Sequence, residues 1–168
     1  MIVTLLIRLL QMLVLIAFQV LVLNHVHFFG YATPMVYVAI LLYLPWNANR
    51  VGTLFLSFVM GLVLDAFSNT PGLTAASMVF AGFIQPYLLH AMAPKDTVED
   101  MVPTYRSMGK WNHVRYVMLI VLIQQVCYFL LECFSFYNYR ELLLTFAGSY
   151  VITLVIVLAL ESFRNRNS

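Results

Sequence analysis

The stretch that decides the fold covers residues 51–92 and reads VGTLFLSFVMGLVLDAFSNTPGLTAASMVFAGFIQPYLLHAM. Two apolar runs, each close to the length of about 20 residues that a helix needs to cross a bilayer, flank the polar turn SNTPG at residues 68–72. In this turn we expect Thr70 to cap the second helix and Pro71 to open it, because these residue types suit those positions. The stretch therefore predicts two consecutive membrane helices.

The composition of the whole chain agrees with a membrane protein. Of 168 residues, 62% are apolar or aromatic, while Lys and Arg number 9 and Asp and Glu number 7. The mean hydropathy is +0.89. A water-soluble domain of this composition would expose large apolar patches that promote association. These numbers exclude an ordinary soluble domain and predict an all-α integral membrane protein.

Working outward from the central stretch, we predict six transmembrane helices in one compact bundle. They cover about residues 5–26, 31–44, 51–67, 72–92, 114–136 and 142–162, with a cytoplasmic loop at 93–113, so that residues 1–168 form a single transmembrane domain. The second helix is short, about 21 Å at 1.5 Å per residue. It must therefore tilt little, thin the bilayer or be sheltered by its neighbours.

Positive charges collect on one side of this predicted topology. Lys and Arg are retained on the cytoplasmic side in short loops. One side holds Arg8, Arg50, Lys95, Arg106, Lys110, Arg115, Arg164 and Arg166, whereas the other holds Arg140 alone. This asymmetry predicts that both termini lie in the cytoplasm.

Small and polar residues recur at a spacing of four on three of the predicted helices, which places each set on one helical face. The sets are Thr53, Ser57, Gly61 and Asp65; Ser77, Ala81 and Gln85; and Thr145, Ser149 and Thr153. Small residues allow membrane helices to approach closely. We therefore interpret the stripes as packing faces in preference to a substrate path.

Asp65 is the polar residue of the first stripe that most needs an explanation. A carboxylate at membrane depth costs on the order of 3 kcal/mol, although its place near the end of helix 51–67 lowers that cost. We expect it to accept hydrogen bonds from backbone N–H groups where the next helix begins, because anions suit helix N-termini. Ion or proton handling is the alternative.

Further polar residues lie in the first and fifth predicted helices, and the sequence leaves two roles open for them. They either build internal hydrogen bonds or meet a partner helix. They are Gln11, Gln19, Gln124, Gln125 and Glu132. Near the end of the sixth helix, Glu161 and Arg164 are expected to pair locally, contributing about 0.3 kcal/mol. His113 is expected to be an ordinary interfacial histidine.

Motifs of known chemistry are missing from the sequence. It contains no nucleophile elbow, phosphate loop or H-E-x-x-H, and His25 and His27 have no further metal-type ligand nearby in the sequence. We therefore predict a protein that is not an enzyme, with no catalytic residue, no metal site and no cofactor.

The segment GLVLDAFSNTPGL at residues 61–73 resembles the rod shape-determining protein MreD family. In that family a helix ends in G-L-x-x-D, a small polar turn follows, and G-L opens the next helix. The motif positions here are Gly61, Asp65, Pro71, Gly72 and Leu73. The length, the short second span and the loop after the fourth span are also similar. Thr74 departs from the basic residue or histidine that is frequent in the family, which leaves no charged partner for Asp65 at that position.

The resemblance implies a non-enzymatic scaffold of the bacterial cell-elongation machinery in the inner membrane. Such a subunit associates with an MreC-like bitopic protein and, through it, with the MreB filament, the RodA glycosyltransferase and a penicillin-binding transpeptidase. The implied fold is similar to the substrate-binding components of energy-coupling-factor vitamin transporters. We expect partner docking on the stripes of the third and sixth helices and at the polar positions of the first and fifth helices. The alternative function is a small-molecule, vitamin-type transporter or its substrate-binding component, with Asp65, Glu132 and the glutamines lining a cavity.

Overall fold

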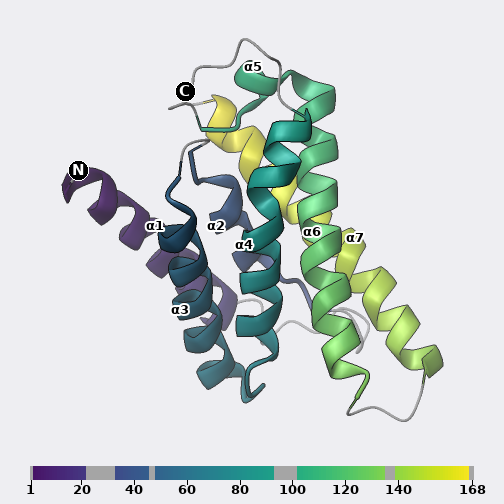
Figure 1. Cartoon of the computed structure of the whole chain (residues 1–168). Coiled ribbons are helices and arrows are strands. Elements are labelled where there is room, and N and C mark those ends of the chain that lie inside the picture. Colours follow the sequence, from purple (N-terminus) through teal and green to yellow (C-terminus); the bar gives the residue numbers. More distant parts are fainter. Residues whose placement is uncertain (1, 22–32, 46–47, 93–101, 135–138, 167–168) are drawn as a thin grey trace.

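The computed structural model of the chain is helical throughout the part that it describes, which comprises residues 2–21, 33–45, 48–92, 102–134 and 139–166 (Figure 1). The elements are α1 (Ile2–Leu21), η2 (Val36–Val38), α2 (Ala39–Leu42), α3 (Arg50–Ser68), α4 (Leu73–Met92), α5 (Tyr105–Met108), α6 (Lys110–Glu132) and α7 (Tyr139–Arg166). Within these residues α3, α4, α6 and α7 are long and apolar enough to cross a membrane, and Leu9–Leu21 forms a shorter apolar helix. The predicted class, an all-α multi-pass membrane protein, is confirmed.

The four long helices run alternately up and down, and α1 lies obliquely beside α3 (Figure 1). The short helix α5 covers one end of the bundle, which we call the α5 end. The opposite end, where residues 69–72 join α3 to α4, is called the hairpin end. The first residues of α1 and the last residues of α7 both lie toward the α5 end (Figure 1).

The second predicted helix, at 31–44, is wrong as a membrane-spanning helix. Residues 33–45, which we call the central segment, contain only the short elements η2 and α2. All side chains from Met35 to Leu42 are 5% exposed or less, and η2 contacts α1, α6 and α7. An apolar run gives the same hydropathy signal whether it faces lipid or lies inside a protein, so hydropathy could not distinguish the two.

The other predicted boundaries agree more closely with the structure. Helices 51–67 and 72–92 correspond to α3 and α4, and 142–162 lies within the longer α7. The predicted loop 93–113 is helical in its last third, because α5 and the first turn of α6 occupy it. Residues 22–26 of the first predicted helix, 31–32 of the second, 93–101 of the loop and 135–136 of the fifth lie outside the described residues.

Helices α3 and α4 pack through a backbone contact that requires glycine. A Cβ atom on Gly61 would lie 2.4 Å from the Cα atom of Ala75 and 2.7 Å from its backbone nitrogen. One turn toward the α5 end, a Cβ on Gly82 would lie 2.7 Å from the Oγ of Ser57. Ser57 and Gly61 are therefore helix-packing residues, and their face of α3 is fully occupied by α4.

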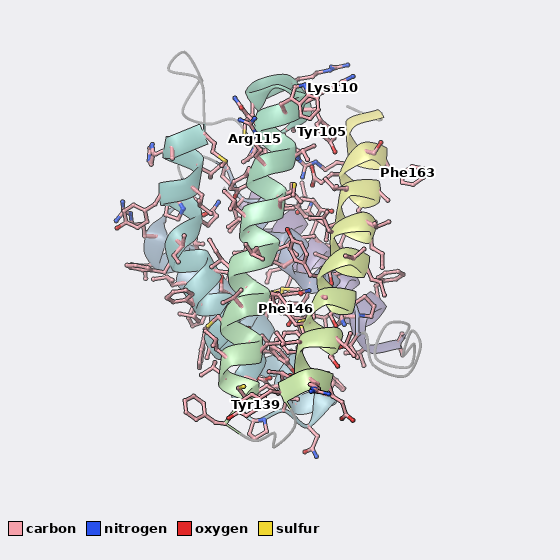
Figure 2. The ribbon with its side chains drawn as sticks, turned by 90° about the vertical axis from the view of Figure 1, so that its right-hand side faces the viewer. Tyr105, Lys110, Arg115, Tyr139, Phe146 and Phe163 are labelled. Carbon is pink, nitrogen blue, oxygen red and sulfur yellow. The ribbon has the colours of Figure 1, made fainter. Side chains whose placement is uncertain are left out.

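The outer surface of the bundle carries large apolar side chains, as contact with lipid requires. Those more than half exposed on α3 and α7 are Val51, Phe55, Leu62, Phe67, Leu143, Leu144, Val151, Val155 and Phe163. Figure 2 shows α6 and α7 side by side, with Lys110 and Arg115 toward the α5 end and Tyr139 toward the hairpin end.

The close contact at Gly61 makes a prediction about stability. The substitution Gly61→Ala should destabilise the protein by about 1–3 kcal/mol, because the added methyl group meets backbone that cannot move aside. The matched control is Gly52→Ala on the same helix, where a Cβ has only the Asn49 Cβ nearby, at 3.9 Å. Reversible unfolding in mixed detergent micelles measures both variants, and equal stability of the two would contradict the described α3–α4 contact.

Candidate functional site

The carboxylate of Asp65 caps the N-terminus of α4. Its Oδ1 accepts hydrogen bonds from the Thr74 backbone N–H at 2.9 Å and from the Thr70 hydroxyl at 2.8 Å, and its Oδ2 accepts one from the Ala75 N–H at 2.9 Å. Asp65 is 7% exposed. A negative charge at this position also interacts favourably with the helix dipole. The predicted capping role of Asp65 is confirmed.

The turn between α3 and α4 differs in detail from the prediction. After Ser68, Asn69 adopts the left-handed conformation with φ 56°, which is a usual way to end a helix. Gly72 has φ +81° and stands between Pro71 and the helix, which begins at Leu73. The expectations that Thr70 caps α4 and that Pro71 opens it are therefore wrong. The Asp65 side chain caps α4 instead, and the positive φ of Gly72 keeps Pro71 outside the helix.

The side chain of Gln19 on α1 binds the backbone of the first residues of the central segment, 33–36, which we call its entry. Its Nε2 donates to the Pro34 carbonyl at 2.8 Å, and its Oε1 accepts from the Val36 N–H at 3.0 Å. Pro34 precedes η2 and Val36 is its first residue, so neither backbone group has a helical partner. Two roles were open for Gln19, which were internal hydrogen bonds and contact with a partner helix. The structure shows the internal role.

The polar stripe of α7 faces the same entry. Thr153 Oγ1 accepts from the Met35 N–H and from Gln125 Nε2, both at 2.9 Å. Gln125 Nε2 also lies 3.2 Å from the Ser149 carbonyl, and Ser149 Oγ accepts from the Thr33 N–H at 3.1 Å. Gln125 thus joins α6 directly to α7, while Ser149 and Thr153 of α7 bind the central segment. The role of Gln125 is internal.

Two further amides bind the segment from α4 and α6. Gln124 Nε2 donates to the Tyr37 hydroxyl at 3.0 Å, and Gln85 Nε2 lies 3.4 Å from the Leu41 carbonyl. Non-helical backbone at membrane depth is tolerated only where protein surrounds it or where it lines a cavity. Most residues of the α3 and α7 stripes are buried in packing and in these bonds, whereas Thr145 is half-buried and donates to the Glu141 carbonyl of its own helix.

A charged cluster holds the α5 end together. Glu161 is fully buried, its Oε1 accepts from Arg164 Nη1 at 3.0 Å, and its Oε2 lies 3.2 Å from His113 Nε2. Arg164 Nη2 also donates to the Pro103 carbonyl at 2.9 Å, and its guanidinium lies 4.8 Å from the ring centre of Tyr43. The predicted pairing of Glu161 with Arg164 is confirmed. The expectation of an ordinary interfacial His113 is wrong, because the imidazole is buried against the same carboxylate.

A cavity of about 430 Å³ lies at the hairpin end. The ends of α1, α3 and α6, the beginning of α4 and the entry of the central segment surround it. Its lining residues are Gln19, Val20, Thr33, Pro34, Met35, Tyr37, Phe67, Ser68, Thr70, Thr74, Tyr128 and Glu132. Of the five polar residues predicted to be partner-facing or internal, Gln19 and Glu132 line this cavity, whereas Gln124 is fully buried. Gln125 lies deeper, and Gln11 is half-buried on α1.

Comparison of the chain with protein families, curated proteins and solved structures gave no match. The resemblance of residues 61–73 to the MreD family therefore rests on those residues and on the overall pattern of the sequence.

The cap on α4 predicts a loss of stability when it is removed. The substitution Asp65→Ala leaves the N–H groups of Thr74 and Ala75 without an acceptor and should cost about 1–3 kcal/mol. Glu141→Ala, which removes an exposed acid in the first turn of α7, should change stability by less than about 0.5 kcal/mol. Both are measured by detergent-induced unfolding, and a neutral Asp65→Ala would contradict the capping role.

The two glutamines of α1 form a matched pair for a second test. Gln19→Leu should destabilise the chain by about 1–3 kcal/mol, because it leaves buried backbone groups of Pro34 and Val36 unpaired. Gln11→Leu has no such consequence and should be neutral or slightly stabilising in lipid. Thermal unfolding in nanodiscs gives both values. A larger loss for Gln11→Leu than for Gln19→Leu would overturn the assigned role of Gln19.

Proposed function

We propose that the chain is a non-enzymatic scaffold subunit of the bacterial cell-elongation machinery and belongs to the rod shape-determining MreD family. The observation that carries the proposal is the α3–α4 corner. Glycine is the only residue type that fits at position 61, because a Cβ there would lie 2.4 Å from the Ala75 Cα, and Asp65 supplies two oxygens to the start of α4. The two most specific residues of the family resemblance thus have interlocking roles. This supports an architecture shared with the family over a chance similarity of sequence.

In this proposal the chain crosses the bacterial inner membrane six times. The first crossing is made by α1, and the second is made by the central segment, which is enclosed by the bundle and is not a lipid-facing helix. Both termini lie in the cytoplasm, together with the α5 end. The start of α1 and the end of α7 both lie toward the α5 end, which supports this topology (Figure 1). Basic residues support it too, because Lys110 and Arg115 lie toward the α5 end (Figure 2) and positive charge is retained on the cytoplasmic side.

The proposed partner is an MreC-like bitopic protein, which links the scaffold to the MreB filament, the RodA glycosyltransferase and the penicillin-binding transpeptidase. Most of the polar stripes are internal, but Thr53 of the α3 stripe and Gln85 of the α4 stripe border an opening on the outer surface. We place the docking site at this recess of about 60 Å³ between the beginning of α3 and the end of α4. The recess is lined by Ala48, Arg50, Thr53, Leu54, Gly82, Phe83, Gln85 and Pro86.

The recess combines an apolar rim with a backbone carbonyl that lacks its helical hydrogen bond. Thr53 and Gln85 are buried beside it, and Phe83 is 53% exposed at its edge. Pro86 has no N–H, so the carbonyl of Gly82 receives no helical hydrogen bond from it. A hydroxyl or amide side chain on a partner helix can bond to such groups, and interhelical hydrogen bonds of this kind favour association in membranes.

The docking site can be tested by filling the recess. Leu54→Trp places a bulky ring in it and should lower co-purification of the MreC-like partner by about tenfold or more, equivalent to about 1.4 kcal/mol of lost binding. The matched control is Val155→Trp on the outer face of α7, where the side chain is 60% exposed; it should leave recovery unchanged.

The thermal midpoint of each variant shows whether it is folded. Full recovery of the partner by a folded Leu54→Trp variant would move the docking site elsewhere. Failure of the wild-type chain to recover the partner would contradict the scaffold function itself.

The second candidate is a vitamin-type transporter or its substrate-binding component, similar in fold to those of energy-coupling-factor systems. The cavity of about 430 Å³ favours this function, because small-molecule sites typically measure about 300–1,000 Å³. Thermal stabilisation by a vitamin would support transport. Stabilisation only by the transmembrane helix of the partner would support the scaffold.

A further inference from the structure

We propose that the cavity at the hairpin end is a binding site for an ammonium group, with the carboxylate of Glu132 as its counter-charge. The cavity is bounded by four helices and the central segment and measures about 430 Å³. The inference is independent of the docking site, because the recess at the α5 end and this cavity share no residue.

Two carboxylates, Asp65 and Glu132, lie in or directly behind the cavity wall, and their surroundings differ sharply. Asp65 receives three hydrogen bonds, from Thr70, Thr74 and Ala75. Within the described part of the chain, Glu132 has no hydrogen-bond or ion-pair partner, although it is half-buried on the cavity wall. An ionisable side chain placed in a membrane helix without a partner is costly and is by default a functional residue. A cationic ligand provides the partner that the described residues do not.

The charge of the cavity wall selects a cation over an anion. Among the described residues that line it there is no Lys, Arg or His. Asp65 lies directly behind the wall, bonded to the lining residues Thr70 and Thr74. Both carboxylates therefore contribute negative potential in a region of low dielectric, where Coulomb interactions are strong.

Aromatic side chains complete a site suited to an ammonium group. Tyr37, Phe67 and Tyr128 line the cavity, and cations bind to the faces of aromatic rings. Tyr37 is fixed by the hydrogen bond that its hydroxyl accepts from Gln124. The Tyr128 hydroxyl has no hydrogen-bond partner within the described residues, which leaves it available to a polar group of the ligand.

The ammonium group can come from two sources that share this chemistry. One is a free amine such as ethanolamine or choline. The other is the ethanolamine headgroup of a phospholipid, because the cavity lies where the membrane helices end and headgroups are found. Glu132 and the aromatic walls would bind both in the same manner.

The experiment uses the full chain in nanodiscs of phosphatidylglycerol, which contains no amine. Choline and ethanolamine are titrated by calorimetry, with 3,3-dimethylbutanol as the neutral isostere of choline. We expect saturable binding of at least one cation and none of the isostere. Adding phosphatidylethanolamine to the nanodisc should weaken the binding of free ethanolamine if the headgroup is the natural occupant and should leave it unchanged if the occupant is a free amine.

Two variants and a control link binding to the cavity. Glu132→Gln should weaken cation binding by about ten- to a hundredfold, as expected for loss of a charged hydrogen-bond partner. Glu141→Gln, an exposed acid at the same end, should bind as the wild type does. Val20→Trp fills the cavity from the α1 wall without touching the carboxylate and should also abolish binding.

Equal binding of the isostere, unchanged binding by folded Glu132→Gln and Val20→Trp, or no binding of either cation in the amine-free nanodisc would each overturn the proposal. None of these results bears on recovery of the MreC-like partner, so the scaffold function is tested separately.

Discussion

The structure depends on one constraint, which is that the backbone of the central segment must find hydrogen-bond partners inside an apolar bundle. The segment has only seven helical residues, so its entry cannot be satisfied by its own helix. Each unpaired buried backbone group would cost energy comparable to a lost hydrogen bond. Side chains from α1, α4 and α7 meet this need: Gln19 and Thr153 bond to backbone groups within residues 34–36, and Gln85 Nε2 lies 3.4 Å from the Leu41 carbonyl.

This constraint also explains how the helices are aligned with one another. Lipid-facing Leu, Val and Phe side chains give little directional information, because lipid chains are as apolar as the helix surface. Hydrogen bonds to a single shared segment fix depth and rotation for four helices at once. The two ends are then fixed separately, by Asp65 on the start of α4 and by Glu161 between His113 and Arg164.

Parts of this arrangement could be predicted from the sequence because the interacting groups are close along the chain. The α3–α4 hairpin and the cap by Asp65 belong to this class. The central segment does not, since its apolar run resembles a membrane helix and its partners lie on distant helices. The buried Glu161 left a detectable signal, because the stripe of Ser149 and Thr153 continues at the same spacing through Val157 to Glu161. No comparable pattern marks His113, and only the fold brings it to that carboxylate.

The account requires that the central segment be shielded from lipid by the surrounding helices. The most direct measurement is nuclear magnetic resonance of methyl groups in nanodiscs, recording cross-relaxation with lipid acyl chains. Ile40 and Leu41 are 1% and 0% exposed, whereas Leu143 and Leu144 on α7 are 66% and 69% exposed. The structure predicts strong lipid cross-peaks for the two α7 leucines and none for Ile40 and Leu41. Lipid cross-peaks of similar strength at Ile40 and Leu41 would contradict it.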